Sequence, residues 1–97
     1  MYSVYTQPVF EWDAGKARRN LAKHGVAFKE AASVFDDPTA LDGEDLLHSA
    51  SEARRLRLGS STSNRVLVVA YTIRGPAVRM ISARLASRKE RKRYVEA

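Results

Sequence analysis

The chain of 97 residues contains no cysteine, only three prolines and five glycines, and no long apolar run. The absence of cysteine excludes disulfides, zinc-thiolate sites and iron–sulfur clusters. The longest apolar run, residues 66–71, is far too short to span a bilayer. Residues 1–10 lack the basic start and apolar stretch of a signal peptide. We therefore expect a cytoplasmic protein that forms one domain over residues 1–97, with a loose tail at residues 1–8.

The net charge of +6 is distributed unevenly along the chain. Residues 1–53 carry 5 basic and 9 acidic side chains, a net charge of −4, whereas residues 54–97 carry 12 basic and 2 acidic ones, a net charge of +10. Ten of those 12 basic residues are arginines, whose planar guanidinium groups bind phosphate in a forked geometry. The second half is therefore expected to contact a polyanion, with a solvated basic surface as the alternative.

The first half is predicted to contain a short strand followed by two helices. Residues 9–12 fit an edge strand, and Asp13 fits the N-cap of a helix over residues 14–24 that ends at Gly25. The spacing of apolar residues on this helix predicts a buried stripe formed by Ala14, Ala17 and Leu21. A second helix is predicted by the i, i+3, i+4, i+7 spacing of Phe28, Ala31, Ala32 and Phe35.

The second half is predicted to be mainly β-structure. Basic and apolar side chains alternate over residues 55–58, as in a strand with one solvated face. The apolar residues 66–72 predict a central, buried strand. Residues 78–83 are expected to pair with that central strand in a hairpin. Residues 39–41 are a weak strand candidate, and residues 42–51 are expected to form a polar, partly acidic loop.

The last helix is expected to begin at Ser87, because Ser87 and Glu90 have the spacing of a capping box. The order of strand, two helices, several strands and helix predicts an α+β fold. We expect an antiparallel sheet of about four strands, with two N-terminal helices packed on it and a C-terminal helix. The core is expected to include Trp12, Phe28 and Phe35.

Several of these segments resemble the BrnT toxin family, which is related to the RelE-like toxins. The similarity spans about Phe10 to Tyr94 in the family order, and its most specific parts are Asn20-x-x-Lys23-His24-Gly25-Val26 and Ile81-Ser82-Ala83-Arg84. The other matching positions are Phe10 to Asp13, Lys16, Ala17, Phe28, Glu30, Ala31, Val34, Phe35, Asp45, His48, Ser49, Glu52, Leu67 to Val69, Tyr71, Thr72, Arg79, Ala86, Glu90, Arg91 and Tyr94.

The resemblance implies a RelE-like fold and endoribonuclease activity on mRNA. It also implies tight inhibition by a BrnA-type antitoxin, a small protein with a ribbon–helix–helix DNA-binding domain. Operator DNA would be contacted only through the toxin–antitoxin complex. Two alternatives stay open, a toxin of the same fold without RNase activity and a non-catalytic nucleic-acid-binding module.

RNA can be cleaved without a metal ion or a thiol when its own 2′-hydroxyl attacks the adjacent phosphorus. The reaction needs a base near the 2′-oxygen, an acid near the leaving 5′-oxygen and positive charge around the phosphate. No cofactor or metal is expected, because the chain has only two histidines, far apart, and scattered carboxylates. His24 is the expected general acid or base, since imidazole exchanges protons near neutral pH. The alternative is that His24 stabilises the dipole of its helix.

By resemblance to RelE-like toxins, whose sheet arginines hold the scissile phosphate, Arg79 and Arg84 are expected to do the same, together with Arg65. The alternative for Arg79 is an outward-facing strand residue without a ligand. RNA contacts are also expected from Lys16, Asn20, Lys23, Tyr71 and Tyr94. The helical members of this set could equally be solvated, and Tyr71 could pack in the core. His48 is assigned mainly to the surface, with an active-site or antitoxin contact as the alternative. The hairpin register decides whether Tyr71 and Arg79 share a face, and the sequence does not determine it.

Overall fold

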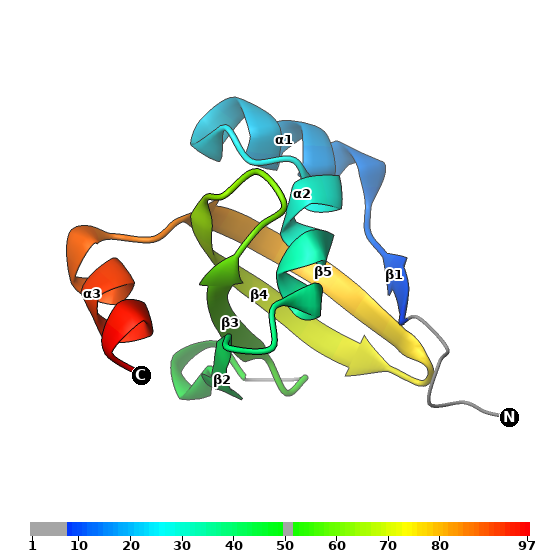
Figure 1. Cartoon of the computed structure of the whole chain (residues 1–97). Coiled ribbons are helices and arrows are strands. Elements are labelled where there is room, and N and C mark those ends of the chain that lie inside the picture. The colour runs from blue at the N-terminus through cyan, green and yellow to red at the C-terminus, as the bar shows by residue number, and fades with distance from the viewer. Residues whose placement is uncertain (1–7, 50–51) are drawn as a thin grey trace, which may run out of the picture.

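The chain folds into strands and helices whose order along the sequence is close to the expected one (Figure 1). The computed structural model describes residues 8–49 and 52–97, so the predicted tail lies outside the described residues except for Pro8. No helix within these ranges is long and apolar enough to cross a membrane. The elements are β1 (Val9–Glu11), α1 (Ala14–His24), α2 (Phe28–Ser33), the 3₁₀ helix η2 (Val34–Asp36), β2 (Leu41–Glu44), the 3₁₀ helix η3 (Leu46–His48), β3 (Arg55–Ser60), β4 (Val66–Arg74), β5 (Ala77–Leu85) and α3 (Arg88–Glu96).

The five described strands form one mixed sheet in the order β1-β5-β4-β3-β2. Strand β1 pairs in parallel with β5, whereas the other neighbours pair antiparallel. The predicted α+β fold, with two N-terminal helices on a sheet and a C-terminal helix, is confirmed. The sheet has one strand more than expected and is not purely antiparallel. A parallel pair needs a long connection between its strands, and here everything from α1 to β4 lies between β1 and β5 in the sequence.

Helix α1 begins and ends where the sequence predicts. The side chain of Asp13 caps its first turn with a hydrogen bond of 2.8 Å, and Gly25, with φ of 69°, donates to the carbonyl of Leu21 at its end. The predicted buried stripe is wrong, however, because Ala14 and Leu21 are exposed. The buried residue of α1 is Asn20, whose amide is turned onto the sheet.

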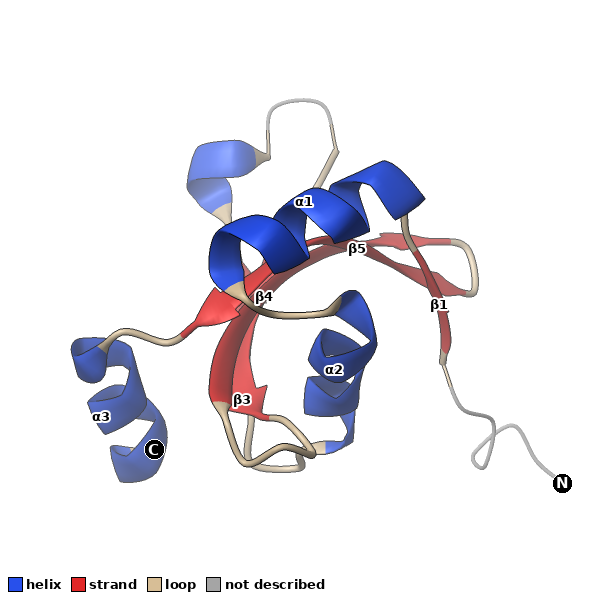
Figure 2. Cartoon of the chain, turned by 90° about the horizontal axis from the view of Figure 1, so that it is seen from above, coloured by secondary structure: helices blue, strands red, loops and turns tan. Residues whose placement is uncertain are grey.

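The hydrophobic core lies between the sheet and the two N-terminal helices, which cover the same face (Figure 2). Phe28 is buried as predicted. The prediction for Trp12 is wrong, because Trp12 is 36% exposed and packs edge-on against Phe28 at 5.9 Å between ring centroids. Phe35 makes a similar contact with Tyr71 at 4.8 Å. The buried members of the core are Val26, Phe28, Ala31, Val34, Leu67, Val69, Tyr71, Val78, Met80 and Ala83.

Leucines and arginines of β3 point to opposite faces of the sheet, as predicted, and the arginines face the helices. The guanidinium of Arg57 lies 5.1 Å from the ring centroid of Phe35 and donates at 3.1 Å to the first carbonyl of η2. Because side chains alternate along a strand, Leu56 and Leu58 point to the other side of the sheet. We call this side, opposite α1 and α2, the open face.

Residues 42–51, predicted as a polar loop, instead begin inside strand β2, and residues 50–51 lie outside the described residues. Residues Leu41–Glu44 pair with Arg55–Leu58 of β3. The carboxylate of Asp42 accepts hydrogen bonds from Arg55 at 2.8 Å and Arg57 at 3.3 Å. Because cross-strand ion pairs stabilise this edge strand, its sequence has no apolar pattern from which strand β2 could be predicted.

Helix α3 stands at the side of the sheet, apart from α1 and α2, and polar contacts hold it there (Figures 1 and 2). The predicted capping box of Ser87 and Glu90 is confirmed. The hydroxyl of Tyr94 donates to Asp37 at 2.6 Å, and Arg84 donates to Glu90 at 2.7 and 2.9 Å. No residue of α3 is buried, so its attachment depends on these polar contacts rather than on apolar packing.

Candidate active site

A groove of about 330 Å³ lies on the open face between the sheet and the η3 segment. It brings one imidazole, one carboxylate, two guanidinium groups and one hydroxyl together, which are groups suited to proton transfer and phosphate binding. We call it the open-face groove. Its lining residues are Asp45, Leu47, His48, Arg54, Leu56, Val68, Ala70, Ile81, Ser82 and Arg84. Within the described ranges, no group of three or more His, Asp or Glu side chains could hold a metal ion.

The imidazole of His48 is held by the carboxylate of Asp45. Nδ1 of His48 lies 2.9 Å from Oδ2 and 3.1 Å from Oδ1 of Asp45. Asp45 is buried and fixed by its backbone, whose N–H donates to the carbonyl of Arg54 at 2.8 Å and whose carbonyl accepts from the hydroxyl of Ser49 at 2.6 Å. An ionised carboxylate only accepts, so the proton belongs on Nδ1, and Nε2 of the exposed ring is left as an acceptor.

Arg84 and Arg54 supply the positive charge of the open-face groove. Hydrogen bonds from Arg84 lower the pKa of Glu90 to about 2, and the same bonds raise the pKa of Arg84. Glu90 and the carbonyl of Leu85 occupy three of the five N–H donors of Arg84, which leaves two without a partner among the described residues. Arg54 forms no ion pair within the described ranges. Both guanidinium groups can therefore donate hydrogen bonds to a phosphate.

Arg79 shares the open face with Arg84 because strand β5 contains an irregularity. Arg79 lies opposite Thr72 and Arg84 lies opposite Val68, two positions of β4 that are four residues apart and so face the same way. The register shifts between Ala70 and Tyr71, which leaves Ile81 without a partner in β4. Tyr71 lies opposite Met80 on the covered face, so Tyr71 and Arg79 point to opposite sides. Arg79 is not among the residues that line the open-face groove.

Three other predicted site residues make contacts within the fold. Arg65 donates to both carboxylate oxygens of Glu30, and this pairing lowers the pKa of Glu30. Burial raises the pKa of Tyr71, whose hydroxyl donates to Asp42 on the covered side of the sheet. Tyr94 is bound to Asp37 at the far end of α3. None of the three lines the open-face groove, so these contacts favour structural roles.

The predicted residues of α1 lie on the side of the sheet that the helices cover. His24, the predicted acid or base, ends this helix and does not line the open-face groove. Asn20 is buried, with its amide bonded to three backbone groups at 2.8–3.0 Å, which favours a structural role over an RNA contact. Lys16 and Lys23 are exposed and form no ion pair within residues 8–49 and 52–97.

The charge difference between the two halves of the sequence is partly cancelled in space. Carboxylates of the first half pair with arginines of the second: Asp42 with Arg55 and Arg57, Glu30 with Arg65, Glu52 with Arg74, and Glu11 with Arg79. The net charge of residues 54–97 therefore overstates the free positive charge on the sheet. Among the described residues, most cations without an ion pair lie on two helices, namely Lys16, Arg18, Arg19 and Lys23 on α1, and Arg88, Lys89, Arg91, Lys92 and Arg93 on α3.

Three residues of the open-face groove were not predicted from the sequence to belong to a site, namely Asp45, Arg54 and Ser82, and His48 was assigned mainly to the surface. A signal was present, because Asp45 and His48 are three residues apart and both match the BrnT pattern. That spacing allows a contact across one turn of a helix, and η3 provides such a turn. This turn was not predicted, because residues 42–51 were assigned to a loop.

These elements define a class of protein, a small α+β protein with helices on one face of a mixed sheet and a cationic groove on the other. A family model described as ribonuclease toxin, BrnT, of type II toxin–antitoxin systems matches residues 12–90. The chain belongs to this family of toxins. Its fold is similar to the crystal structure of the ribonuclease toxin BrnT of Brucella abortus, with a TM-score of 0.65 and 24% sequence identity over 84% of this chain and 100% of that chain. No curated protein matches the sequence.

Proposed function

We propose that the chain cleaves RNA in the open-face groove without a metal ion. The observation that supports this most is the oriented imidazole of His48, which is bound to Asp45 in the same groove as Arg54 and Arg84. A proton-transfer group and positive charge around the phosphate are two of the features that attack by the 2′-hydroxyl requires. The family description, which names a ribonuclease toxin, supports the same reaction class.

In the proposed reaction, Nε2 of His48 accepts the proton of the 2′-hydroxyl as the 2′-oxygen bonds to phosphorus. The bond from phosphorus to the 5′-oxygen of the next nucleotide then breaks, and the imidazolium returns its proton to that oxygen. The products are a 2′,3′-cyclic phosphate and a 5′-hydroxyl. Asp45 stabilises the imidazolium, and Arg84 and Arg54 stabilise the charge on the pentavalent phosphorus. The loss of one such donor costs roughly 2–4 kcal/mol of transition-state stabilisation.

The same proposal assigns the chain a BrnA-type antitoxin with a ribbon–helix–helix domain, mRNA as the substrate, and the cytoplasm as the place of action. Operator DNA would be contacted only through the complex with the antitoxin. The family description supports an antitoxin partner, because it names a type II toxin–antitoxin system. Expression of the chain alone should arrest growth, and co-expression of the protein encoded next to its gene should restore growth.

The test is incubation of purified protein with mRNA in excess EDTA, followed by analysis of the fragment ends. The wild-type protein should give 2′,3′-cyclic phosphate and 5′-hydroxyl ends, and His48→Ala should give almost none. Absence of cleavage by well-folded wild-type protein, or cleavage only with a divalent cation, would overturn the proposed chemistry. Salt-dependent RNA binding without products would favour a non-catalytic binding module. Growth arrest without RNA cleavage would favour a toxin that has no RNase activity.

A further inference from the structure

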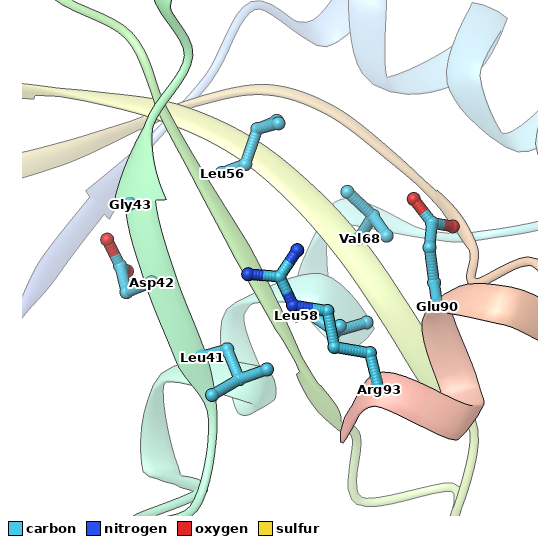
Figure 3. A pocket seen from close by; sticks show the side chains of 8 residues that line it. All are labelled: Leu41, Asp42, Gly43, Leu56, Leu58, Val68, Glu90 and Arg93. Atoms are coloured by element: carbon cyan, nitrogen blue, oxygen red, sulfur yellow. The ribbon is translucent and has the colours of Figure 1, made fainter. Parts of the chain in front are cut away.

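A second groove, of about 240 Å³, lies on the open face between the edge strand β2 and helix α3 (Figure 3). Three leucines and a valine line it, together with the backbone of Gly43 and the side chain of Arg93. The strand register explains why these side chains gather, because Leu41 lies opposite Leu58, and Leu58 lies opposite Val68. We call it the leucine groove, and define it by Leu41, Gly43, Leu56, Leu58, Val68 and Arg93.

The leucine groove is apolar and open to solvent. Leu56 is 36% exposed, and a Cβ atom built on Gly43 would meet nothing within 4 Å. The two N-terminal helices cover the opposite face of the sheet, and α3 borders the leucine groove without burying any residue of its own. Leu47, which is 91% exposed, lines the open-face groove, with which the leucine groove shares Leu56 and Val68. Leu41 and Leu58 are half-buried and Val68 is buried, so the leucine groove exposes apolar surface mainly at Leu56. A groove of partly exposed apolar side chains on a sheet face is typical of an interaction surface.

Helix α3 gives one wall of the leucine groove a positive charge. It carries five basic and two acidic residues, and none of its cations forms an ion pair within the described ranges. Arg93 projects from it across the leucine groove (Figure 3). Of the two acidic residues beside the leucine groove, Asp42 turns its carboxylate to the arginines on the covered side of the sheet, and Glu90 is bound to Arg84. A fitting partner therefore presents apolar side chains and free carboxylates together. The phosphates of RNA would pair with the cations, but RNA has no apolar side chains to pack against the leucines.

We infer that the leucine groove is the docking site of the antitoxin, which places apolar side chains of an acidic amphipathic segment among the leucines and its carboxylates toward Arg93. This inference rests on the proposed toxin function. Leu56 and Val68 line both grooves, so a segment seated in the leucine groove also reaches the open-face groove that holds His48. The antitoxin then inhibits the toxin by occupying the path of the RNA chain rather than by distorting the fold.

Two pairs of variants test this docking site. Gly43→Trp adds a large side chain to the leucine groove at a position where a Cβ atom meets nothing within 4 Å, and Ala22→Trp adds the same side chain to the exposed surface of α1. Arg93→Glu reverses the charge of the wall, and Arg18→Glu makes the same reversal on α1. The probe is the purified protein encoded next to the toxin gene, and calorimetry measures its binding to each folded toxin variant at two salt concentrations.

We expect Gly43→Trp to weaken binding by at least about thirtyfold, as for the loss of a central interface contact. Arg93→Glu should weaken binding by about tenfold and reduce its salt dependence, whereas both α1 variants should bind like the wild type. Equal binding by all four variants would overturn the docking site and leave the proposed toxin function intact. No binding by the wild-type toxin would overturn both proposals. A wild-type dimer that Gly43→Trp makes monomeric, or a loss of RNA affinity alone in Arg93→Glu, would assign the leucine groove to a second copy or to RNA instead.

Discussion

Asn20 and Ala83 are hydrogen-bonded to each other in both directions across the interface between α1 and β5. Nδ2 of Asn20 donates to the carbonyl of Ala83 at 2.8 Å, and the N–H of Ala83 donates to Oδ1 of Asn20 at 3.0 Å. Nδ2 also donates to the carbonyl of Val26 at 2.9 Å. One buried amide therefore fixes the helix, the turn after it and the strand relative to one another.

Asn20→Ala should lower the free energy of unfolding by roughly 2–4 kcal/mol, because it leaves buried backbone groups of Ala83 and Val26 without partners. Urea denaturation measures this loss. Lys23→Ala, on the exposed side of the same helix, is the control and should change stability by less than about 0.5 kcal/mol. A fully stable Asn20→Ala protein with weakened RNA binding would instead support the RNA contact predicted from the sequence.

The two histidines can be separated by kinetics. His48→Gln should lower kcat for RNA cleavage by about a hundredfold or more, since it removes the proton acceptor. Asp45→Asn should also lower kcat while His48 remains, because the imidazole loses the carboxylate that orients it. His24→Gln should cost much less. The reverse order for the two histidine variants, with both proteins folded, would place the reaction at the end of α1.

The three arginines predicted to hold the scissile phosphate, Arg65, Arg79 and Arg84, are expected to have different roles. Arg84→Gln should lower RNA cleavage by roughly a hundredfold through the loss of charge around the phosphate. Arg65→Gln should instead lower the free energy of unfolding and leave the cleavage rate of the folded protein nearly unchanged, because Glu30 loses its partner in a half-buried position. Single-turnover kinetics and urea denaturation of both variants give the comparison. An unchanged rate in folded Arg84→Gln would remove Arg84 from the active site.

Gly59 marks a close approach between β3 and the segment that follows α2. A Cβ atom at Gly59 would lie 2.8 Å from Cβ of Ala40 and 3.0 Å from Cγ1 of Val34, closer than packed side chains permit. Gly59→Ala should therefore destabilise the protein by about 1–3 kcal/mol, as measured by the thermal unfolding midpoint. Gly43→Ala makes the same change in open space and should be nearly neutral. Equal stability of the two variants would mean that the backbone near Gly59 moves apart easily.

Acid should weaken the attachment of α3. The pKa of Glu90 is lowered to about 2 from an ordinary value of 4.5, so its pairing with Arg84 stabilises the folded protein above about pH 4.5. This contribution is lost as the pH falls from about 4.5 toward 2, and for a partly exposed pair it amounts to about 1 kcal/mol. Glu90→Gln keeps the capping box and should reduce the loss of stability between about pH 6 and pH 3, measured by urea denaturation. Glu96→Gln is the control, and equal losses in the two variants would contradict the assignment.

Local signals predicted helices well, because their cause lies in neighbouring residues. Asp13 and Gly25 determine both ends of α1, and Ser87 determines the start of α3. The face that a helix or strand buries depends on distant partners, and there the sequence was less informative. The alternation in β3 indicated two faces but not that Arg57 would pack over the aromatic ring of Phe35.

The candidate site was harder to predict than the fold. Arg84, predicted as a phosphate-binding residue, lines the open-face groove, and its catalytic role stays a prediction. His48 was assigned mainly to the surface, because the η3 turn that binds it to Asp45 has no strong apolar pattern. Asn20 was predicted to be a surface residue, and only the position of β5 shows that its amide is buried.

Ile81, the residue of β5 without a partner in β4, determines to which face of the sheet the side chains that follow it point. Because one position is skipped there, Arg79 and Arg84 share a surface although they are an odd number of residues apart. In a perfectly regular strand the same amino acids would place either Arg79 or Arg84 among the buried side chains, and the open face would lose one of its guanidinium groups. The charge of this side of the sheet therefore depends on the strand geometry at one residue as well as on the amino acids that the strand carries.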